Sequence, residues 1–176
     1  SPLRAQPIYP PIENGLLKTW VGVGGTPESV VRAAHYGFPL MLAIIGGEPA
    51  RFEPYVDLFK RALAQAERAA LPIGCHSPGH VADTDEQARE EVWPHFLQQR
   101  TKIGAERGWP PPSKAQFLSE VGPKGALYVG SPESVARKIA NTVSALSLDR
   151  FDLKYSNGPL PHALMLRSIE LLGTKV

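Results

Sequence analysis

The sequence predicts an α/β fold in which four strand–helix units form a parallel sheet. Short apolar runs alternate with longer segments that carry helix-start and helix-stop residues. Strands and helices that alternate in this way are joined by right-handed crossovers, so the strands lie parallel. The runs are nearly all apolar, which is typical of strands covered on both faces. A length of 176 residues suits one such domain.

Four runs are predicted to be strands because β-prone, apolar residues lie between turns rich in glycine or proline. They cover residues 20–23, 39–45, 71–75 and 151–155. The segment from His76 to His80 contains a proline and a glycine, and it is predicted to be a loop. Residues 1–19 hold four prolines and are expected to form an extended lead-in. The predicted half-barrel or open-sheet domain therefore spans residues 20–176.

The predicted helices mostly begin at serine or threonine caps, followed by proline or acidic residues. They cover residues 27–36, about 49–69, 84–107, a short stretch near 115, 131–146 and 161–172. The second helix is expected to bend at Pro54. Gly37, Gly108 and Gly173 are the expected stops. Residues 108–128, with three consecutive prolines at 110–112, are expected to form an irregular insertion before the last helix–strand unit.

Four such units are compatible with two architectures. A doubly wound sheet is covered by its own helices on both faces. Four units of a (β/α)8 barrel instead leave one sheet face and two strand edges open. The chain begins Ser-Pro-Leu-Arg without a methionine, so we expect a processed protein or a piece of a longer one.

Composition excludes several classes of protein. The charges, 19 Lys+Arg against 17 Asp+Glu, are scattered, so nucleic acid is not an expected partner. The longest apolar run, residues 38–45, is far shorter than the roughly 20 residues of a membrane span. The single cysteine, Cys75, excludes an internal disulfide framework, and we expect a buried, inert thiol. No secretion signal is evident, and the expected location is the cytoplasm.

The segment Gly24-Gly25-Thr26-Pro27-Glu28-Ser29 joins the first predicted strand to its helix. Glycines allow the backbone to approach an anion, and the free N–H groups of a helix start, with hydroxyls such as those of Thr26 and Ser29, bind phosphate oxygens. The segment has no Walker lysine, and Pro27 occupies the third glycine position, which disfavours a dinucleotide or triphosphate relative to a monophosphate. An ordinary turn capped by Thr26 is an equally open interpretation.

Residues 129–135, Val-Gly-Ser-Pro-Glu-Ser-Val, nearly repeat residues 23–30 with one glycine fewer. Helix capping is sufficient to explain the second copy, because no clear strand is predicted before it. Duplication of a strand–helix unit is the alternative interpretation. Ten residues do not decide between the two.

Several segments together resemble the bacterial luciferase-like monooxygenases. They are WVGVGGTPESVVRAA, GFPLMLAIIGG, CHSPGHVADT, VGSPESVARKI and RFDLKYSNGPLPH, followed by SIELLGTKV. The resemblance extends from about residue 8 to residue 176, and it is to strands five to eight of that family's (β/α)8 barrel. It therefore implies the C-terminal half of a barrel rather than a doubly wound sheet.

The resemblance implies a flavin-dependent monooxygenase that uses reduced FMN, or alternatively F420, and O2 to oxidise a small organic substrate. In the family, the loop after the fifth strand holds the flavin phosphate at positions that match Gly24, Gly25, Thr26 and Ser29. The luciferases proper have an acidic residue at the position of Gly25. Other phosphate ligands and catalytic residues belong to the first half of the barrel. We therefore do not expect this chain alone to be active, and we expect the N-terminal half or another copy as a partner.

Five further residues are substrate-side candidates because they follow predicted strands, where barrel enzymes place their chemistry. They are His76, Ser77, His80, Lys154 and Tyr155. His76 is a weak candidate for a catalytic donor, and a loop histidine bonded to backbone groups is the favoured interpretation. Lys154 is equally explained by an ion pair with Asp152 or Glu170. His76 and His80 have the i, i+4 spacing of a metal pair, but Pro78 and Gly79 between them forbid a helix and no third ligand is near, so no metal site is expected.

Two other functions remain open at this stage. The first is a stand-alone, non-catalytic α/β domain that binds a phosphorylated ligand. The second is a flavinless subunit that completes the barrel of a partner. A stand-alone domain requires a closed core, whereas a half-barrel exposes apolar surface and associates through it.

Overall fold

The computed structural model describes residues 18–156 and 158–176 of the chain. The elements follow in the order β1 (Val21–Val23), α1 (Pro27–Tyr36), β2 (Leu40–Ala43), the 3-10 turn η1 (Pro49–Phe52), α2 (Glu53–Gln65), β3 (Ile73–Val81), α3 (Asp85–Arg107), α4 (Lys114–Val121), β4 (Tyr128–Gly130), α5 (Pro132–Leu146), β5 (Arg150–Lys154) and α6 (His162–Lys175).

All strand pairs are parallel, and β1, β2, β3 and β5 lie side by side in chain order. Residues 73–76 of β3 pair with β2 and residues 74–78 pair with β5, so these two strands occupy opposite edges of β3. The last residues of β3, 79–81, pair with β4. The predicted α/β fold with a parallel sheet is confirmed, and the three pairings that join β1, β2, β3 and β5 have the order of neighbouring strands in a barrel.

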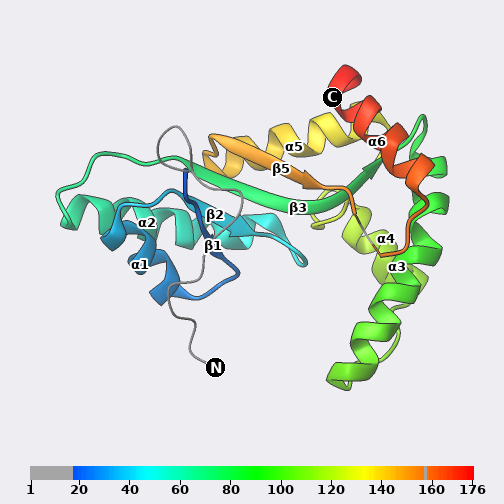
Figure 1. The fold of residues 1–176 in the computed structure, drawn as a ribbon, viewed down its shortest axis with the longest axis horizontal. Helices are drawn as coiled ribbons and strands as arrows, with labels where there is room; N and C mark the ends of the chain where they lie inside the picture. Colours follow the sequence, from blue (N-terminus) through cyan, green and yellow to red (C-terminus); the bar gives the residue numbers. More distant parts are fainter. Residues whose placement is uncertain (1–17, 157) are drawn as a thin grey trace, which may run out of the picture.

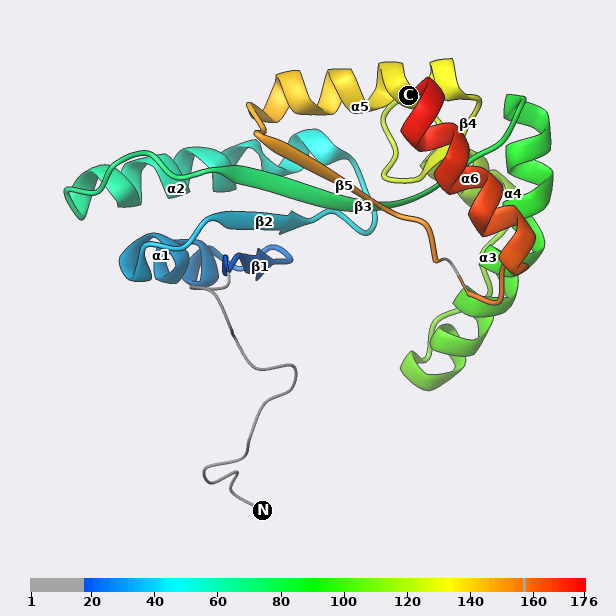
Figure 2. The same cartoon turned by 45° about the horizontal axis from the view of Figure 1, so that its top comes forward.

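One face of the sheet is packed against α1, α2 and α5. Val23, Leu42, Cys75 and Phe151 are in register across the four strands and belong to the main hydrophobic core. Figures 1 and 2 show α1, α2 and α5 running along the strands. Burial raises the pKa of the Cys75 thiol to about 12, with a smaller contribution from the charge of Asp152. The thiol is therefore buried and protonated at neutral pH, as predicted.

The opposite face of the sheet is less covered. Met41, Ala43, His76 and Asp152 on that face are only half-buried, and Arg150 is exposed. Registers across β2, β3 and β5 place these residues on the same side, away from the main core. A doubly wound sheet would bury both faces. The half-open face therefore agrees with four units of a barrel rather than with a self-contained doubly wound domain.

Between β3 and α5 the chain forms a unit with its own small core. Residues of α3, α4 and β4, among them Val92, Phe96, Phe117 and Val129, make up a second hydrophobic cluster. Figures 1 and 2 show α3 and α4 at the end toward which β2 and β3 point. The ammonium of Lys138 on α5 ties this unit to the barrel helices by donating to the carbonyls of Gly122 at 2.7 Å and Leu127 at 2.8 Å.

β3 is longer than predicted, because the segment from His76 to His80 is strand and not loop. In a parallel ladder the carbonyl of Ile44 would accept next from residue 78, which is a proline without an N–H. The buried Ser77 hydroxyl donates to that carbonyl instead, at 2.9 Å. β2 ends at Ala43, and the Ser77 hydroxyl replaces the one ladder donor that Pro78 lacks. Pairing with β4 and β5 then continues the strand.

Two helices also differ from the predicted limits. The segment predicted as one bent helix is the turn η1 followed by α2, which ends at Gln65 rather than near Ala69. Pro54 lies in the first turn of α2, where no N–H is needed, and so does not bend it. Helix α6 continues through Gly173 to Lys175 instead of ending at that glycine. Among the described helices, none is both long and apolar enough to cross a membrane.

Candidate functional site

The turn between β1 and α1 is built by two glycines and a proline. Gly25 has φ 123°, a conformation that only glycine adopts without strain. A Cβ at Gly24 would have no neighbour within 4 Å, so the backbone there is open to a ligand. Pro27 begins α1 and Thr26 is its N-cap residue. Among described residues, no hydrogen bond uses the N–H of Thr26 or Glu28.

The predicted hydroxyl pair lies together at this helix start, joined by a cation. The Thr26 hydroxyl donates to Ser29 Oγ at 2.9 Å, and Arg32 Nη2 donates to the same oxygen at 2.9 Å. Ser29 Oγ accepts both bonds and so keeps its own hydrogen for a further acceptor. Thr26 makes no capping bond with its side chain, unlike Thr84, Ser113 and Ser131 at the starts of α3, α4 and α5. Simple capping therefore does not explain Thr26.

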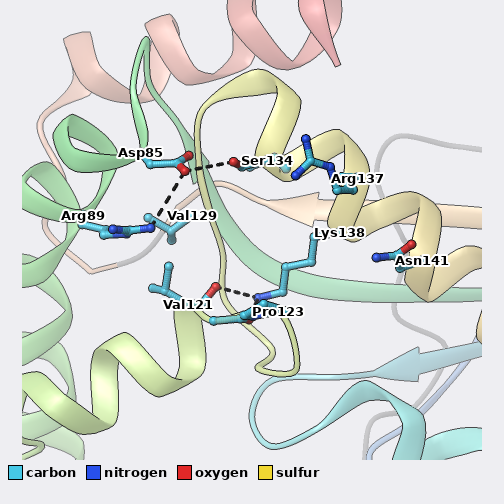
Figure 3. A pocket seen from close by; sticks show the side chains of 11 residues that line it. Asp85, Arg89, Val121, Pro123, Val129, Ser134, Arg137, Lys138 and Asn141 are labelled. Atoms are coloured by element: carbon cyan, nitrogen blue, oxygen red, sulfur yellow. Dashed lines mark hydrogen bonds and ion pairs between the residues drawn. The ribbon is translucent and has the colours of Figure 1, made fainter.

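The second copy of the motif, at the start of α5, binds an anion that belongs to the protein. The backbone N–H of Ser131 donates to Asp85 Oδ1 at 2.7 Å, and the Ser134 hydroxyl donates to Asp85 Oδ2 at 2.9 Å. A Cβ at Gly130 would lie 2.8 Å from Asp85 Oδ1, so glycine is needed for the carboxylate to come close. Figure 3 shows Asp85 directed at Ser134 beside a cavity of about 210 Å³.

The pKa of Asp85 also indicates that the second copy stabilises a negative charge. Its pKa lies below the usual value, first because the backbone N–H of Ser131 donates to it and then because of the Ser134 and Ser131 side chains and the charge of Arg89; burial opposes these effects. The N-terminal end of the α5 dipole acts in the same direction. The second copy, Gly130-Ser131-Pro132-Glu133-Ser134, therefore forms a site that holds carboxylate oxygens.

Replacing Asp85 with Asn should lower the free energy of unfolding by about 1–2 kcal/mol at pH 7, because the negative charge and one of the two acceptor oxygens are lost. The folded-state pKa of Asp85 is lowered, so its stabilising effect is present above the unfolded pKa of about 3.9 and is lost as the pH falls through the folded value. Urea unfolding at pH 7 and pH 3 should show the difference from wild type shrinking. Asp57→Asn, at an exposed position on α2, is the control. A constant difference at both pH values would contradict the assignment.

The other predicted site residues divide into two groups. His76 is half-buried on the open face of the sheet, in register with Ala43 and Asp152. Lys154 ends β5 and is exposed, and Tyr155 follows it with 44% of its surface exposed. Asp152 and Glu170, the two predicted partners of Lys154, form ion pairs with Arg150 at 2.8 Å and with Arg167 at 2.9 Å. These three candidates are accessible, His76 on the open face of the sheet and Lys154 and Tyr155 at the end of β5.

Ser77 and His80 are instead enclosed by the protein. Ser77 is fully buried and bonded to the Ile44 carbonyl. His80 is 1% exposed, and its Nε2 lies 2.6 Å from Glu91 Oε2 on α3. Both were predicted in a loop that the structure shows to be strand, and neither offers a surface to a substrate here. No group of three metal-ligating side chains occurs among the described residues.

We call residues 24–29, with the side chains that contact them, the cradle at α1. The sequence did not predict two of the residues that contact this segment. Arg32 follows Ser29 by one helical turn, a spacing that places both side chains on one face and could have indicated the contact. Tyr55 on α2 donates its hydroxyl hydrogen to the Gly25 carbonyl at 2.8 Å. That contact joins residues 30 positions apart, and no local pattern predicts it.

Comparison with solved structures shows the same fold in monooxygenases and in an F420-dependent reductase. The monooxygenase RslO1 from Streptomyces bottropensis superimposes with a TM-score of 0.70 at 18% identity, over 89% of this chain and 46% of that one. The oxygenating constituent of 3,6-diketocamphane monooxygenase from Pseudomonas putida, solved with FMN, gives 0.65 at 16%, over 89% and 46%. The F420-dependent tetrahydromethanopterin reductase of Methanopyrus kandleri gives 0.55 at 15%, over 89% and 49%.

The chain thus spans about half the length of these solved structures. A comparison with curated proteins gives no match. The profile of the family described as luciferase-like monooxygenase matches residues 2–149, which include β1, the turn at Gly25 and the whole of α5. The chain belongs to the luciferase-like monooxygenase family.

Proposed function

We propose that this chain supplies the flavin-phosphate site of a luciferase-like, flavin-dependent monooxygenase. The phosphate binds at the start of α1, to the N–H groups of Thr26 and Glu28, the Ser29 hydroxyl, which Thr26 Oγ1 orients by donating to it, and the guanidinium of Arg32. Gly24 and Gly25 leave room for the approach of the anion. FMN is the proposed cofactor, with F420 as the alternative.

The single observation that carries this proposal is the carboxylate at the second copy of the motif. Ser131 and Ser134 hold Asp85 through one backbone N–H and one hydroxyl, at 2.7 and 2.9 Å. Thr26 and Ser29 are the corresponding residues of the first copy, and no carboxylate of the described chain binds them. Arg32 adds a positive charge beside Ser29 Oγ, as Arg89 does beside Asp85 at 3.9 Å. An external anion therefore fits the first copy.

When bound, reduced flavin would supply electrons to O2, and the oxygen activated in this way would oxidise a small organic substrate. The residues of this chain bind and orient the cofactor by its phosphate. His76, Lys154 and Tyr155 are the proposed substrate-side groups, because they lie on the open face or at the end of β5. The remaining barrel strands come from the N-terminal half or from another copy, and their docking on the half-open sheet face would exclude water from the site.

The test of the proposal compares two flavins that differ only in the phosphate. FMN should bind the chain at least about ten-fold more tightly than riboflavin, as expected for bonds to a charged group worth about 1.5–3 kcal/mol each. The preference should weaken as salt is added, because Arg32 and α1 act partly through charge. Fluorescence titration measures both affinities. Equal binding of FMN and riboflavin at low salt would contradict the proposal.

A further inference from the structure

Tyr55 lies on α2, outside the motif that forms the phosphate cradle, yet it contacts the motif directly. Its hydroxyl donates to the Gly25 carbonyl at 2.8 Å, and its ring packs 5.7 Å from that of Phe52 at the edge of the main core. We propose that Tyr55 is a positioning residue that fixes the direction of the Thr26 N–H toward the cofactor phosphate. This inference rests on the proposed function.

The argument begins with the planarity of the peptide bond. The Gly25 carbonyl and the Thr26 N–H belong to the same planar, trans unit, so they point in opposite directions. A donor that holds the carbonyl oxygen therefore also sets where the N–H points. Tyr55 holds that oxygen from one side, which leaves the N–H directed to the other.

The peptide unit at the start of α5 has the same arrangement, and both its carbonyl and its N–H are hydrogen-bonded. The Gly130 carbonyl accepts from the backbone N–H of Ala82 at 3.2 Å. The N–H of the same peptide unit, that of Ser131, donates to Asp85 Oδ1 at 2.7 Å. A peptide fixed at its carbonyl thus presents its N–H to an anion at α5. At α1 the Tyr55 hydroxyl donates to the Gly25 carbonyl, as the Ala82 N–H donates to the Gly130 carbonyl at α5.

The first copy needs such a restraint more than the second. Gly25 has φ 123°, whereas Gly130 is not in the positive-φ region. Two glycines, Gly24 and Gly25, precede Thr26, whereas Gly130 alone precedes Ser131. Glycine has no Cβ and can adopt many conformations, and ordering them on binding costs affinity. The Tyr55 ring is half-buried between α2 and the core, so its hydroxyl position is itself fixed. Backbone freedom at Gly25 is thereby removed before the ligand arrives.

Tyr55→Phe tests the inference, because it removes the hydroxyl and keeps the ring. We expect FMN affinity to fall about five-fold, the loss expected when part of a residue's backbone freedom must be ordered on binding. Riboflavin affinity and the melting temperature should stay close to wild type. In 15N-labelled protein the Thr26 amide resonance should shift less on addition of FMN. Tyr36→Phe, at a position 62% exposed on α1, is the matched control and should change nothing.

The outcomes separate this inference from the proposed function. If wild-type protein binds FMN more tightly than riboflavin and Tyr55→Phe retains the full preference, the positioning role is wrong while the phosphate site stands. If Tyr55→Phe weakens both flavins equally, Tyr55 supports the fold and not the phosphate contact, and the inference is again wrong. If wild-type protein does not distinguish the two flavins, the proposed site fails and the role of Tyr55 fails with it.

Discussion

Gly79→Ala should lower the free energy of unfolding by about 3 kcal/mol or more, the upper range for an overpacked core. Gly79 lies where β3 passes from pairing with β5 to pairing with β4. A Cβ there would be 2.6 Å from the Tyr128 carbonyl oxygen and closer still to the Leu153 side chain. The Leu153 side chain can move, but the Tyr128 carbonyl belongs to a strand backbone. The added methyl group must therefore shift β4 or widen the gap between β3 and β4.

Thermal unfolding measures this effect. A loss of that size corresponds to a fall in melting temperature of about 6–12 °C for a chain of this length. Gly22→Ala in β1 is the control, because a Cβ at Gly22 meets nothing within 4 Å. A melting temperature of Gly79→Ala as high as that of Gly22→Ala would show that the junction of β3, β4 and β5 is not closely packed.

Thr26→Val combined with Ser29→Ala should weaken FMN binding by at least about ten-fold, because the Ser29 bond to a charged phosphate is lost together with the Thr26 hydroxyl that donates to Ser29 Oγ. Riboflavin binding should be unchanged, since that flavin has no phosphate to contact. Both hydroxyls lie on the same side of the α1 start and are 2.9 Å apart, so they act on one group. Neither caps the helix, and the loss of stability should therefore be small.

Ser113→Ala is the matched control for the double variant. Ser113 caps α4 by accepting from the Gln116 N–H at 3.1 Å, so its loss costs stability without touching the α1 cradle. Its FMN affinity should equal that of wild type. Isothermal calorimetry measures the affinity of each variant for FMN and for riboflavin. An FMN affinity of the double variant within two-fold of wild type would place the phosphate elsewhere.

Local sequence signals predicted most of the helix limits. The Thr26-Pro27 start of α1 and the stops at Gly37 and Gly108 are where the sequence placed them, and both glycines adopt the left-handed conformation. Such signals succeed because caps and left-handed turns depend on a residue and its immediate neighbours. These helix limits can therefore be predicted without knowing how the rest of the chain packs.

The errors arose where tertiary pairing overrides local preference. Pro78 and Gly79 read as loop residues, but β3 runs through them because β4 and β5 supply partners and Ser77 supplies the missing donor. β4 has only three residues, yet Tyr128-Val129-Gly130 precedes the second motif as Val23 and the two glycines precede the first. Treating the near-repeat as a full strand–turn–helix unit would have revealed β4.

The candidate site was predictable only in its local part. The hydroxyls of Thr26 and Ser29 and the glycine turn follow from the order of the residues. Tyr55 comes from the next strand–helix unit, and Asp85 reaches α5 from 46 residues away. Those contacts depend on how the units pack, which periodicity and capping do not specify.

Residue-resolved NMR of the wild-type chain tests the central claim most directly. Backbone amide shifts are recorded with FMN and with riboflavin, and the riboflavin shifts are subtracted so that only the effect of the phosphate remains. The account predicts that the largest differences fall on the amides of Thr26 and Glu28 at the start of α1. Differences centred on any other part of the chain, with those two amides unmoved, would contradict it.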